Sequence, residues 1–410
     1  MTENNTMLVA NDLGYGFVKA KVDGQLIKMP SVIAEKQTFM NPNPDTLTDK
    51  YMENFMSKMD VSISSAAVRR SGRFLIGDAA ASGSSRKQTF NIYNGSGKSD
   101  DDMAMILSLS LVAGMKVKEA YAKKQNIFEP LTANVIMTTA LPISEGRNVE
   151  KRHAYEKLYT DRKHVVTFNN FGDPITVTIN FEKVRCYLEG EVASVALVNA
   201  AEGLSGFDVL DGLKKAVAKD YEANYPERAA KYGVKEVLSA QNTLSIDIGE
   251  GTTDLVVATN GEANPEASDS VDLGFGTALE KTRQEARIKG LGNFKSRYEL
   301  KKYLSRDLIG ANKEKQDAIE AVLDENIVPL SEGIVDAVSN ILTLVSNDLD
   351  VIYVYGGGSV PMAERSHLRE QLVQLVDSMN ATCSVIWIDK EFAQQMNEIG
   401  LEIALTVLAG

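Results

Sequence analysis

The sequence contains very little cysteine, histidine and tryptophan. Its 410 residues include two cysteines, Cys186 and Cys383, one tryptophan, and three histidines, His153, His164 and His367. Two cysteines so far apart in a chain of this size do not predict a structural disulfide, and they fit a reducing cytoplasm. The histidines show no metal-ligand spacing, whereas a metal site or a catalytic triad needs ligands that converge. We therefore expect neither a histidine metal site nor a histidine-based triad.

Long apolar runs and an excess of basic residues are also missing. The first residues, MTENNT, lack the basic and apolar regions of a signal peptide. The longest apolar stretch, Met103–Met115, is too short to span a bilayer and predicts a buried helix. The 56 acidic residues outnumber the 44 Lys and Arg, and the net charge of −12 disfavours direct contact with nucleic-acid phosphates. We expect a cytoplasmic protein that binds no membrane and reaches DNA only through a partner.

One pattern occurs twice in the chain. Asp12 and Asp247 each follow apolar strand residues, and each is followed by an apolar residue, Gly, any residue and Gly. Both stretches then continue as apolar sequence to a turn dipeptide, Asp23–Gly24 in one and Asn260–Gly261 in the other, which is a strong hairpin signal. A chain of 410 residues also exceeds the usual size of a single core. The repeat therefore predicts two related lobes, each with a hairpin of this kind.

The remaining pattern along the chain alternates between strands and helices. We expect a polar, loop-rich insertion at about residues 36–100, and a charged surface helix over about residues 280–325. The other expected strands are Gln25–Glu35, broken by Pro30, then Gly72–Ala80, Ala133–Ser144, strands up to Gly190, and a buried strand that leads into Gly356–Gly358. The other expected helices are Met103–Lys124, Glu191–Gly203, Leu213–Glu236, Glu332–Asn347 and Glu391–Leu408.

The two Asp-x-Gly-x-Gly stretches have residues suited to binding a polyphosphate. Glycines let backbone N–H groups approach an anion, and an acid beside phosphate must face a cation, for which hydrated Mg²⁺ is the best candidate. Lys19 on the returning strand, and Thr252 and Thr253 in the second stretch, add donors. One copy alone is as well explained by the needs of a turn. Two copies, with the glycines Gly356–Gly358 after a late apolar strand, favour a phosphate site.

These three motifs resemble the phosphate and adenosine motifs of the actin, sugar kinase and heat-shock chaperone superfamily. Within it, the chain resembles the bacterial actin-like proteins of plasmid partition, the ParM or StbA group, and VIMTTALPIS is similar to a strand of those proteins. The resemblance implies an α/β fold of two related actin-like, ribonuclease H-like lobes with a nucleotide cleft between them. The first lobe would comprise residues 1–186 and a C-terminal helix at about 388–410, and the second would comprise residues 187–387.

The resemblance also implies roles for individual residues. Asp12 and Asp247 would hold the metal through water, with Asp247 also counted among the catalytic residues. Glu189 would orient the attacking water as a weak general base, with Glu191 as the competing choice, because Leu188 stands where the family often has proline. The nucleotide would contact Asp12, Gly14, Tyr15, Gly16 and Lys19 in the first loop, Gly249, Glu250, Gly251, Thr252 and Thr253 in the second, and Gly276, Thr277, Gly356, Gly357, Gly358 and Ser359 elsewhere.

Three functions compete on this basis. The first is a filament-forming ATPase for plasmid segregation, with ATP as the nucleotide, GTP as the alternative, Mg²⁺ as the metal, copies of itself as partners, and a DNA-binding adaptor at a plasmid centromere. The second is a small-molecule kinase of the same superfamily, acting on a sugar or an acid, although no substrate-binding run follows the second hairpin. The third is a chaperone-like switch, which would need a substrate domain after the glycine motif. We expect the first.

Overall fold

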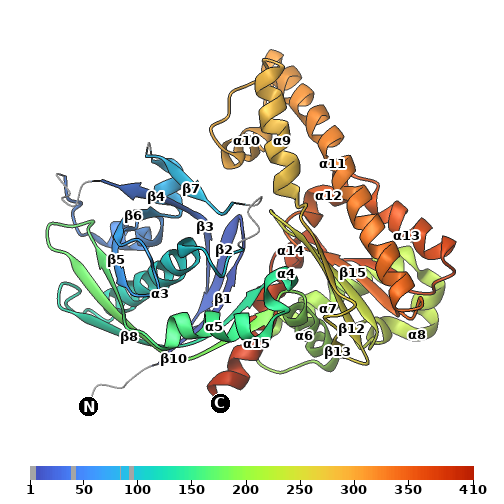
Figure 1. Cartoon of the computed structure of the whole chain (residues 1–410), viewed down its shortest axis with the longest axis horizontal. Helices are drawn as coiled ribbons and strands as arrows, with labels where there is room; N and C mark the ends of the chain where they lie inside the picture. The colour runs from blue at the N-terminus through green and yellow to red at the C-terminus, as the bar shows by residue number, and fades with distance from the viewer. Residues whose placement is uncertain (1–5, 38–42, 84, 92–96) are drawn as a thin grey trace. The chain divides into compact units, whose positions relative to one another are not determined.

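The computed structural model describes residues 6–37, 43–83, 85–91 and 97–410, and its chain folds as two compact units (Figure 1). Unit 1 comprises Met1–Leu141, Glu145–Leu188 and Asn397–Gly410, and unit 2 comprises Pro142–Ser144 and Glu189–Met396. The main part of unit 1 ends at Leu188, where the sequence analysis expected residue 186. Its C-terminal segment begins at Asn397, where the sequence analysis expected about residue 388.

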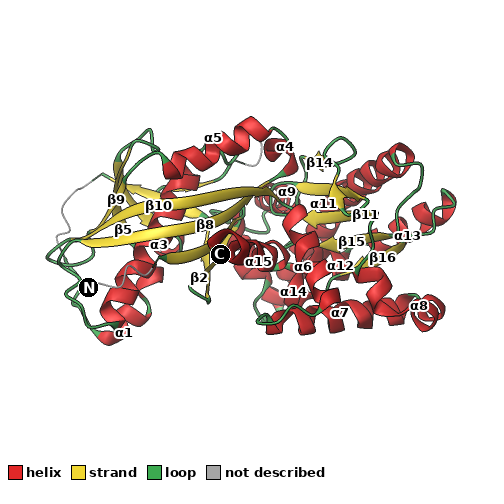
Figure 2. Ribbon diagram, turned by 90° about the horizontal axis from the view of Figure 1, so that it is seen from below, coloured by secondary structure: helices red, strands yellow, loops and turns green. Residues whose placement is uncertain are grey.

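Unit 1 is built on a mixed sheet that has ten strands among the described residues, in the order β3-β2-β1-β8-β10-β9-β5-β6-β4-β7. Strands β1, β8 and β10 pair in parallel at its centre, and the other pairs are antiparallel. Figure 2 shows the long strands β8 and β10 crossing the unit. The strands are β1 (Met7–Leu13), β2 (Phe17–Val22), β3 (Gln25–Pro30), β4 (Val32–Lys36), β5 (Asp60–Ser65), β6 (Gly72–Ile76), β7 (Lys87–Thr89), β8 (Leu131–Leu141), β9 (His164–Phe168) and β10 (Ile175–Leu188).

The helix predicted at Met103–Lys124 is the core helix of unit 1. It is α3 (Asp102–Ala122), and the Asp101 carboxylate caps it by accepting a hydrogen bond from the Met103 N–H. Its residues are apolar on nearly all sides because the helix is buried in the main core of the unit. The other helices of unit 1 are α1 (Asp49–Glu53), the 3₁₀ turn η1 (Phe55–Ser57), α2 (Asp78–Ser82), α5 (Val149–Thr160) and α15 (Met396–Ala409), while α4 (Ile143–Gly146) begins in unit 2 and ends in unit 1.

The C-terminal helix α15 joins unit 1 through side-chain contacts with the central strands. The Lys21 ammonium on β2 lies 2.7 Å from the Glu402 carboxylate, and the Thr138 hydroxyl on β8 donates to the Leu401 carbonyl at 2.8 Å. Residues 381 and 263 positions away along the chain therefore hold β2 and β8 to α15.

Unit 2, whose residues are all described, has a six-stranded sheet. Its order is β13-β12-β11-β15-β16, with β14 also paired to β12. The strands are β11 (Thr243–Ile248), β12 (Thr253–Thr259), β13 (Glu262–Ala263), β14 (Asp269–Val271), β15 (Val351–Tyr355) and β16 (Ser384–Trp387). The helices are α6 (Glu191–Glu202), α7 (Asp208–Asn224), α8 (Pro226–Leu238), α9 (Phe275–Ile288), α10 (Arg297–Leu304), α11 (Ala311–Leu344), α12 (Ser359–Arg365), α13 (Leu368–Ser378) and α14 (Lys390–Ala393).

Both predicted hairpin turns are confirmed. Asp23 and Gly24 have φ values of 46° and 81°, and Asn260 and Gly261 have 54° and 79°. Positive φ at both central residues is the requirement of a type I′ turn, which Asx-Gly meets at low cost. Each dipeptide joins two antiparallel strands, β2 to β3 in unit 1 and β12 to β13 in unit 2.

Several predicted elements differ from those observed. The helix expected at Leu213–Glu236 is two helices, α7 and α8, because Pro226 begins a new helix. The strand expected at Gly72–Ala80 ends at Ile76, because Gly77 takes a φ of 59° and α2 follows. The single charged helix expected at residues 280–325 is three helices, α9 to α11, separated by segments that contain Gly290 and Gly310 at positive φ. The last predicted helix is split into α14 and α15, and the helix expected at Glu332–Asn347 is the second half of α11, which continues through Pro329.

The insertion expected at residues 36–100 contains more regular structure than its composition suggests. Strands β5, β6 and β7 extend the sheet of unit 1, and α1 and α2 accompany them. Residues 38–42, 84 and 92–96 of this segment lie outside the described residues.

Among the described residues, one helix, α11, is long and apolar enough to cross a membrane by length and composition alone. Its inward side chains, including Ile319, Leu330 and Ile341, belong to the core of unit 2. A core helix of a water-soluble domain passes the same test, so this feature is weak evidence for a membrane span.

Candidate functional site

The two Asp-x-Gly-x-Gly stretches form the same tight turn, one in each unit. The Gly14 N–H donates to the Phe17 carbonyl at 3.0 Å, and the Gly249 N–H donates to the Thr252 carbonyl at 2.9 Å. A Cβ at Gly14 would lie 2.8 Å from that carbonyl oxygen, and a Cβ at Gly249 would lie 2.9 Å from its counterpart. The close backbone approach therefore requires glycine at the first position of both turns. The predicted repeat of strand, tight turn and strand is confirmed.

The acid in the unit 1 turn already has a cationic partner. Asp12 stands opposite Lys19 across the β1–β2 ladder, and the Lys19 Nζ lies 2.9 Å from the Asp12 Oδ2. The Asp12 side chain is almost fully buried and that of Lys19 is one-fifth exposed. The Lys19 ammonium thus offsets part of the cost of burying the Asp12 carboxylate at the start of the turn.

A second lysine, which the sequence analysis missed, supports the same turn. Lys98 is 1% exposed, its Nζ donates to the Leu13 carbonyl at 3.0 Å, and it lies 4.7 Å from the centre of the Tyr15 ring. Its own backbone N–H donates to the Glu145 carboxylate at 2.8 Å, as does the N–H of Ser99 at 2.9 Å. The only sequence signal was Gly-Lys-Ser within a polar segment that we took for a loop.

Ser31 fixes the shape of the unit 1 turn from the outside. Its hydroxyl donates to the Gly14 carbonyl at 2.6 Å, and its N–H donates to the Gly16 carbonyl at 2.9 Å. Ser31 thereby fixes the orientation of two peptide groups of the turn. Sequence analysis did not single out Ser31, because it follows Pro30 within a strand that we expected to be broken there.

In unit 2 the N-terminus of α9 is bonded directly to the turn. The Phe275 N–H donates to the Gly249 carbonyl at 3.0 Å, and the Gly276 N–H donates to the Glu250 carbonyl at 2.8 Å. A Cβ at Gly276 would lie 2.4 Å from that same Glu250 oxygen, so no larger residue fits there. The positive end of the α9 dipole therefore points at the turn, which is the arrangement that favours an anion.

Two of the predicted hydroxyl donors have structural partners. The Thr253 hydroxyl donates to the Leu273 carbonyl at 2.8 Å, and the Thr277 hydroxyl donates to the Gly274 carbonyl at 2.6 Å. Both side chains are buried. These hydroxyls thus hold the segment before α9 in place.

The glycine loop after β15 packs against Asp247. Asp247 pairs with Tyr355 in the parallel β11–β15 ladder, and Gly356 follows with a φ of 96°. A Cβ at Gly356 would lie 2.2 Å from the Asp247 Oδ1, and the Gly358 N–H donates to the Ile248 carbonyl at 2.7 Å. Two of the three sequence motifs are therefore adjacent within unit 2, with the start of α9 on one side and the start of α12 on the other.

Glu189 lies within electrostatic range of the Tyr355 hydroxyl, at the end of β15. The pKa of the Tyr355 hydroxyl is raised well above its usual value, first by burial and then by the carboxylates of Asp247, Asp254 and Glu189. Glu189 is buried, and Glu191 is half-buried in the first turn of α6. Glu189 is thus more sheltered from water than Glu191, which lies at a helix start. The choice of Glu189 over Glu191 as the weak base stays a prediction.

The remaining predicted residues divide between the units. Asp12, Gly14, Tyr15, Gly16 and Lys19 belong to unit 1, while Glu189, Asp247 and all the other predicted contacts belong to unit 2. The described residues contain no group of three or more His, Cys, Asp or Glu that could hold a metal ion. A metal at either turn would therefore take most of its ligands from water and phosphate, as Mg²⁺ commonly does.

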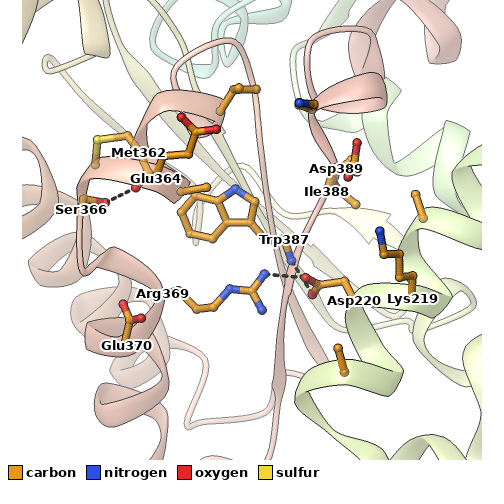
Figure 3. Close-up of a pocket in the computed structure, with 15 residues that line it drawn as sticks. Lys219, Asp220, Met362, Glu364, Ser366, Arg369, Glu370, Trp387, Ile388 and Asp389 are labelled. Atoms are coloured by element: carbon orange, nitrogen blue, oxygen red, sulfur yellow. Dashed lines mark hydrogen bonds and ion pairs between the residues drawn. The ribbon is translucent and has the colours of Figure 1, made fainter.

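A separate hollow of 510 Å³ lies in unit 2, and no residue of that unit's glycine turn lines it (Figure 3). It is bordered by α7, α12, α13 and the end of β16. Asp220 on α7 joins these elements, because its carboxylate accepts from the Arg369 guanidinium at 2.6 Å and from the Trp387 backbone N–H at 3.0 Å. The latter bond satisfies a donor on the sheet's edge strand, which protects that edge from pairing with another chain. None of the predicted site residues lines this hollow.

Two related sheets with the same glycine turn after the first strand define a two-lobe actin-like protein. Residues 10–191 match the family model described as the N-terminal domain of actin-like proteins, and residues 245–370 match that of the archaeal actin homologue MreB-like C-terminal domain. The chain belongs to the actin-like proteins. A search of curated proteins finds no match.

Solved structures with the same fold include an actin-like protein and ParM proteins. The actin-like protein Alp7A has a TM-score of 0.68 and 16% identity, over 98% of this chain and 97% of its own. Bacillus thuringiensis ParM with ATP has a TM-score of 0.55 and 16% identity, over 98% and 99%. A non-polymerisable quadruple mutant of pCBH ParM has a TM-score of 0.58 and 17% identity, over 98% and 100%. At these identities the likeness establishes the fold.

Proposed function

We propose that this chain is a cytoplasmic nucleoside triphosphatase that binds Mg·ATP, assembles with copies of itself into filaments, and thereby segregates plasmid DNA. The observation that carries the proposal is the glycine turn found once in each unit, with an acid at its start and, in unit 2, a helix N-terminus bonded to it. Such turns present N–H groups to phosphate. ATP is the expected nucleotide, because a ParM of the same fold was solved with it, and GTP is the alternative.

The residues fit a hydrated magnesium ion. Asp12 and Asp247 each begin a glycine turn, and the glycine loop approaches the Asp247 carboxylate closely, because a Cβ at Gly356 would lie 2.2 Å from it. Asp12 and Asp247 would hold the ion through water, and when bound it would neutralise charge on the phosphates. Glu189 would accept a hydrogen bond from the attacking water and take up its proton.

Self-assembly and plasmid segregation rest on the family. One relative of the same fold is described as a non-polymerisable mutant, which implies that its parent polymerises. The net charge of −12 disfavours direct DNA binding, so we propose that a DNA-binding adaptor at a plasmid centromere links the filament to its cargo. No membrane partner is proposed.

Light scattering and pelleting after addition of Mg·ATP test the proposal. The wild-type protein should scatter and pellet with Mg·ATP and not without nucleotide, whereas Asp247→Ala should do neither. Asp269→Ala is the matched control, because Asp269 is an exposed acid in the same unit. Transfer of phosphate to a sugar without any pelleting would contradict the proposal and favour the kinase. Pelleting that never responds to a cognate adaptor with its centromere DNA would contradict the plasmid role.

The choice of base is tested by a matched pair of variants. Glu189→Gln should slow phosphate release by roughly 10²-fold, the usual size of a general-base contribution, while ATP binding persists. Glu191→Gln should hydrolyse ATP at nearly the wild-type rate. The opposite order in a single-turnover assay would assign the role to Glu191.

A further inference from the structure

The two lysines beside the unit 1 turn differ in exposure. The Lys19 side chain is 20% exposed, and its ammonium pairs with Asp12 at 2.9 Å. Lys98 is only 1% exposed, and its Nζ donates to the Leu13 carbonyl at 3.0 Å. An ammonium that is closed to water is also closed to a phosphate arriving from solution. Lys98 therefore acts on the backbone of the turn, whereas Lys19 is open to a ligand.

Lys98 fixes one peptide group of the turn together with the turn's own hydrogen bond. The Leu13 carbonyl and the Gly14 N–H belong to the same peptide group; the carbonyl accepts from Lys98, and the N–H donates to the Phe17 carbonyl at 3.0 Å. Because a peptide group is planar and rigid, bonds on its two edges set its orientation. Leu13 directly follows Asp12, so this group links the acid to the backbone of the turn.

An aromatic ring holds the Lys98 ammonium at the turn as well. The Lys98 Nζ lies 4.7 Å from the centre of the Tyr15 ring, and Phe90 packs edge-on against that ring with the two centres 5.7 Å apart. The face of an aromatic ring attracts a cation, which offsets part of the cost of burying it. The Tyr15 ring and the Leu13 carbonyl together confine the ammonium.

A buried carboxylate fixes the loop that carries Lys98. Glu145 is 6% exposed and accepts from the backbone N–H groups of Lys98 and Ser99 at 2.8 and 2.9 Å, and from the Ser99 hydroxyl at 2.8 Å. Gly97 has a φ of 74°, and a Cβ there would lie 2.2 Å from the carboxyl carbon of Glu145. Successive N–H groups that converge on one anion form a nest. Glu145 thus sets the position of Lys98 through the backbone.

We propose that Lys98 and Glu145 are positioning residues for nucleotide binding at the unit 1 turn. Glu145 holds the loop of residues 97–99, the loop places Lys98, and Lys98 orients the Leu13–Gly14 peptide group. The inference rests on the proposed function and names the residues that shape one of its phosphate turns. A well-oriented turn contacts the phosphates before and during hydrolysis alike. Loss of either residue should therefore weaken nucleotide binding more than it slows the chemical step.

Steady-state ATPase kinetics of a lysine variant test the role of Lys98. Lys98→Met keeps the length of the side chain and removes its ammonium. It should raise the KM for Mg·ATP about tenfold and change kcat by less than about twofold, as expected when a charged donor is lost from a binding group. Equilibrium titration with Mg·ADP should show a similar loss of affinity.

Lys151→Met is the matched control. The Lys151 Nζ lies 4.0 Å from the same Glu145 carboxylate, but its side chain is one-third exposed, as is usual for a weak surface pair. Its KM and kcat should both stay within about twofold of the wild type. An equal rise of KM in Lys151→Met and Lys98→Met would indicate a general effect of charge and overturn the proposal.

A double variant tests the link between the two residues. Glu145→Gln should raise the KM by about three- to tenfold with little change in kcat, because its amide nitrogen cannot accept the bonds that a carboxylate oxygen accepts now. If Glu145 acts through Lys98, adding Glu145→Gln to Lys98→Met should raise the KM by no more than about twofold further. Two effects that multiply in full overturn the link. If Lys98→Met does not fold, the split between KM and kcat in Glu145→Gln decides the proposal.

The outcomes separate this inference from the proposed function. If Lys98→Met and Glu145→Gln lower the melting temperature but leave the KM unchanged, both residues are merely structural, and the inference is overturned while the ATPase stands. A fall in kcat at unchanged KM overturns it as well. A wild-type protein that neither binds nor hydrolyses Mg·ATP contradicts the proposed function, and the inference fails with it.

Discussion

At the scale of single residues, the glycines after β15 show which positions are constrained by sterics. Gly356 has a φ of 96°, and its missing Cβ would collide with the Asp247 Oδ1 at 2.2 Å. We expect Gly356→Ala to destabilise unit 2 by about 1–3 kcal/mol and to weaken ATP binding, because the strain falls on the carboxylate at the turn. Thermal unfolding and nucleotide titration measure both effects.

Gly357 provides the matched control. A Cβ there would have no neighbour within 4 Å, and its φ is not in the left-handed region. Gly357→Ala should therefore change the free energy of unfolding by only a few tenths of a kcal/mol. Equal losses of stability in the two variants would contradict the steric explanation.

Glu398 predicts a pH dependence of stability. It is 2% exposed, and burial, with further contributions from Glu402 and Asp12, raises its pKa from 4.5 to about 7, although Lys21 and Lys19 act in the opposite direction. Because the folded-state pKa is the higher one, the folded chain binds more protons than the unfolded chain between those two pH values. The free energy of unfolding should therefore fall as the pH rises through this window, and stay lower above it.

Glu398→Gln should flatten that dependence and raise the free energy of unfolding at pH 8 by about 2 kcal/mol. Urea unfolding at pH 5 and pH 8 measures it, with the exposed Glu391→Gln as the control. If the free energy of unfolding rises between pH 5 and pH 7 by the same amount in the wild type and in Glu398→Gln, the attribution of the pH dependence to Glu398 is contradicted.

Sequence analysis could identify residues whose role is local. Asp12, Gly14, Asp247 and Gly249 were found because a turn needs them at a fixed spacing along the chain. Lys98 was missed because it reaches Leu13 from 85 positions away, and no spacing rule connects the two. Such contacts arise from tertiary packing, which a single sequence does not display.

At the scale of elements, the buried ion pair on β5 and β6 holds the added strands of unit 1 together. The Arg73 side chain is fully buried, and its Nε and one terminal nitrogen lie 2.6 and 2.8 Å from the Asp60 carboxylate, which also receives Lys36 from β4 at 2.8 Å. Asp60→Ala should destabilise unit 1 by roughly 3–5 kcal/mol, because it leaves a buried guanidinium without its carboxylate.

Urea unfolding of Asp60→Ala and of the exposed control Asp161→Ala measures this effect. The control should stay within about 0.5 kcal/mol of the wild type. A loss of less than about 1 kcal/mol in Asp60→Ala would show that water or another group replaces the carboxylate, and that the added strands do not depend on it.

Elements were predicted well where their pattern is strong and local. Helix α3 and strands β1, β8, β10, β11 and β15 follow from apolar runs with clear ends. In the 36–100 segment β6 was predicted, but β5 and β7 were missed, because these short strands have few apolar residues. The boundaries at Gly77, Gly290 and Gly310 depend on backbone conformations that glycine permits but does not dictate.

At the scale of the whole molecule, the account depends on both turns serving one Mg·ATP. If they do, the losses of hydrolysis rate caused by removing the two carboxylates should not add. A site that has lost one essential carboxylate is slow already, so removing the second slows it little further. If each unit had a nucleotide site of its own, each single variant would keep the activity of the other unit. The two possibilities differ in a rate that can be measured directly.

Phosphate release at saturating Mg·ATP from wild type, Asp12→Asn, Asp247→Asn and the double variant is therefore the most direct test. The account predicts that each single variant is slower by at least about 10²-fold and that the double variant is no slower than the worse single variant by more than a few-fold. Two single variants that each retain about half of the wild-type rate would contradict it.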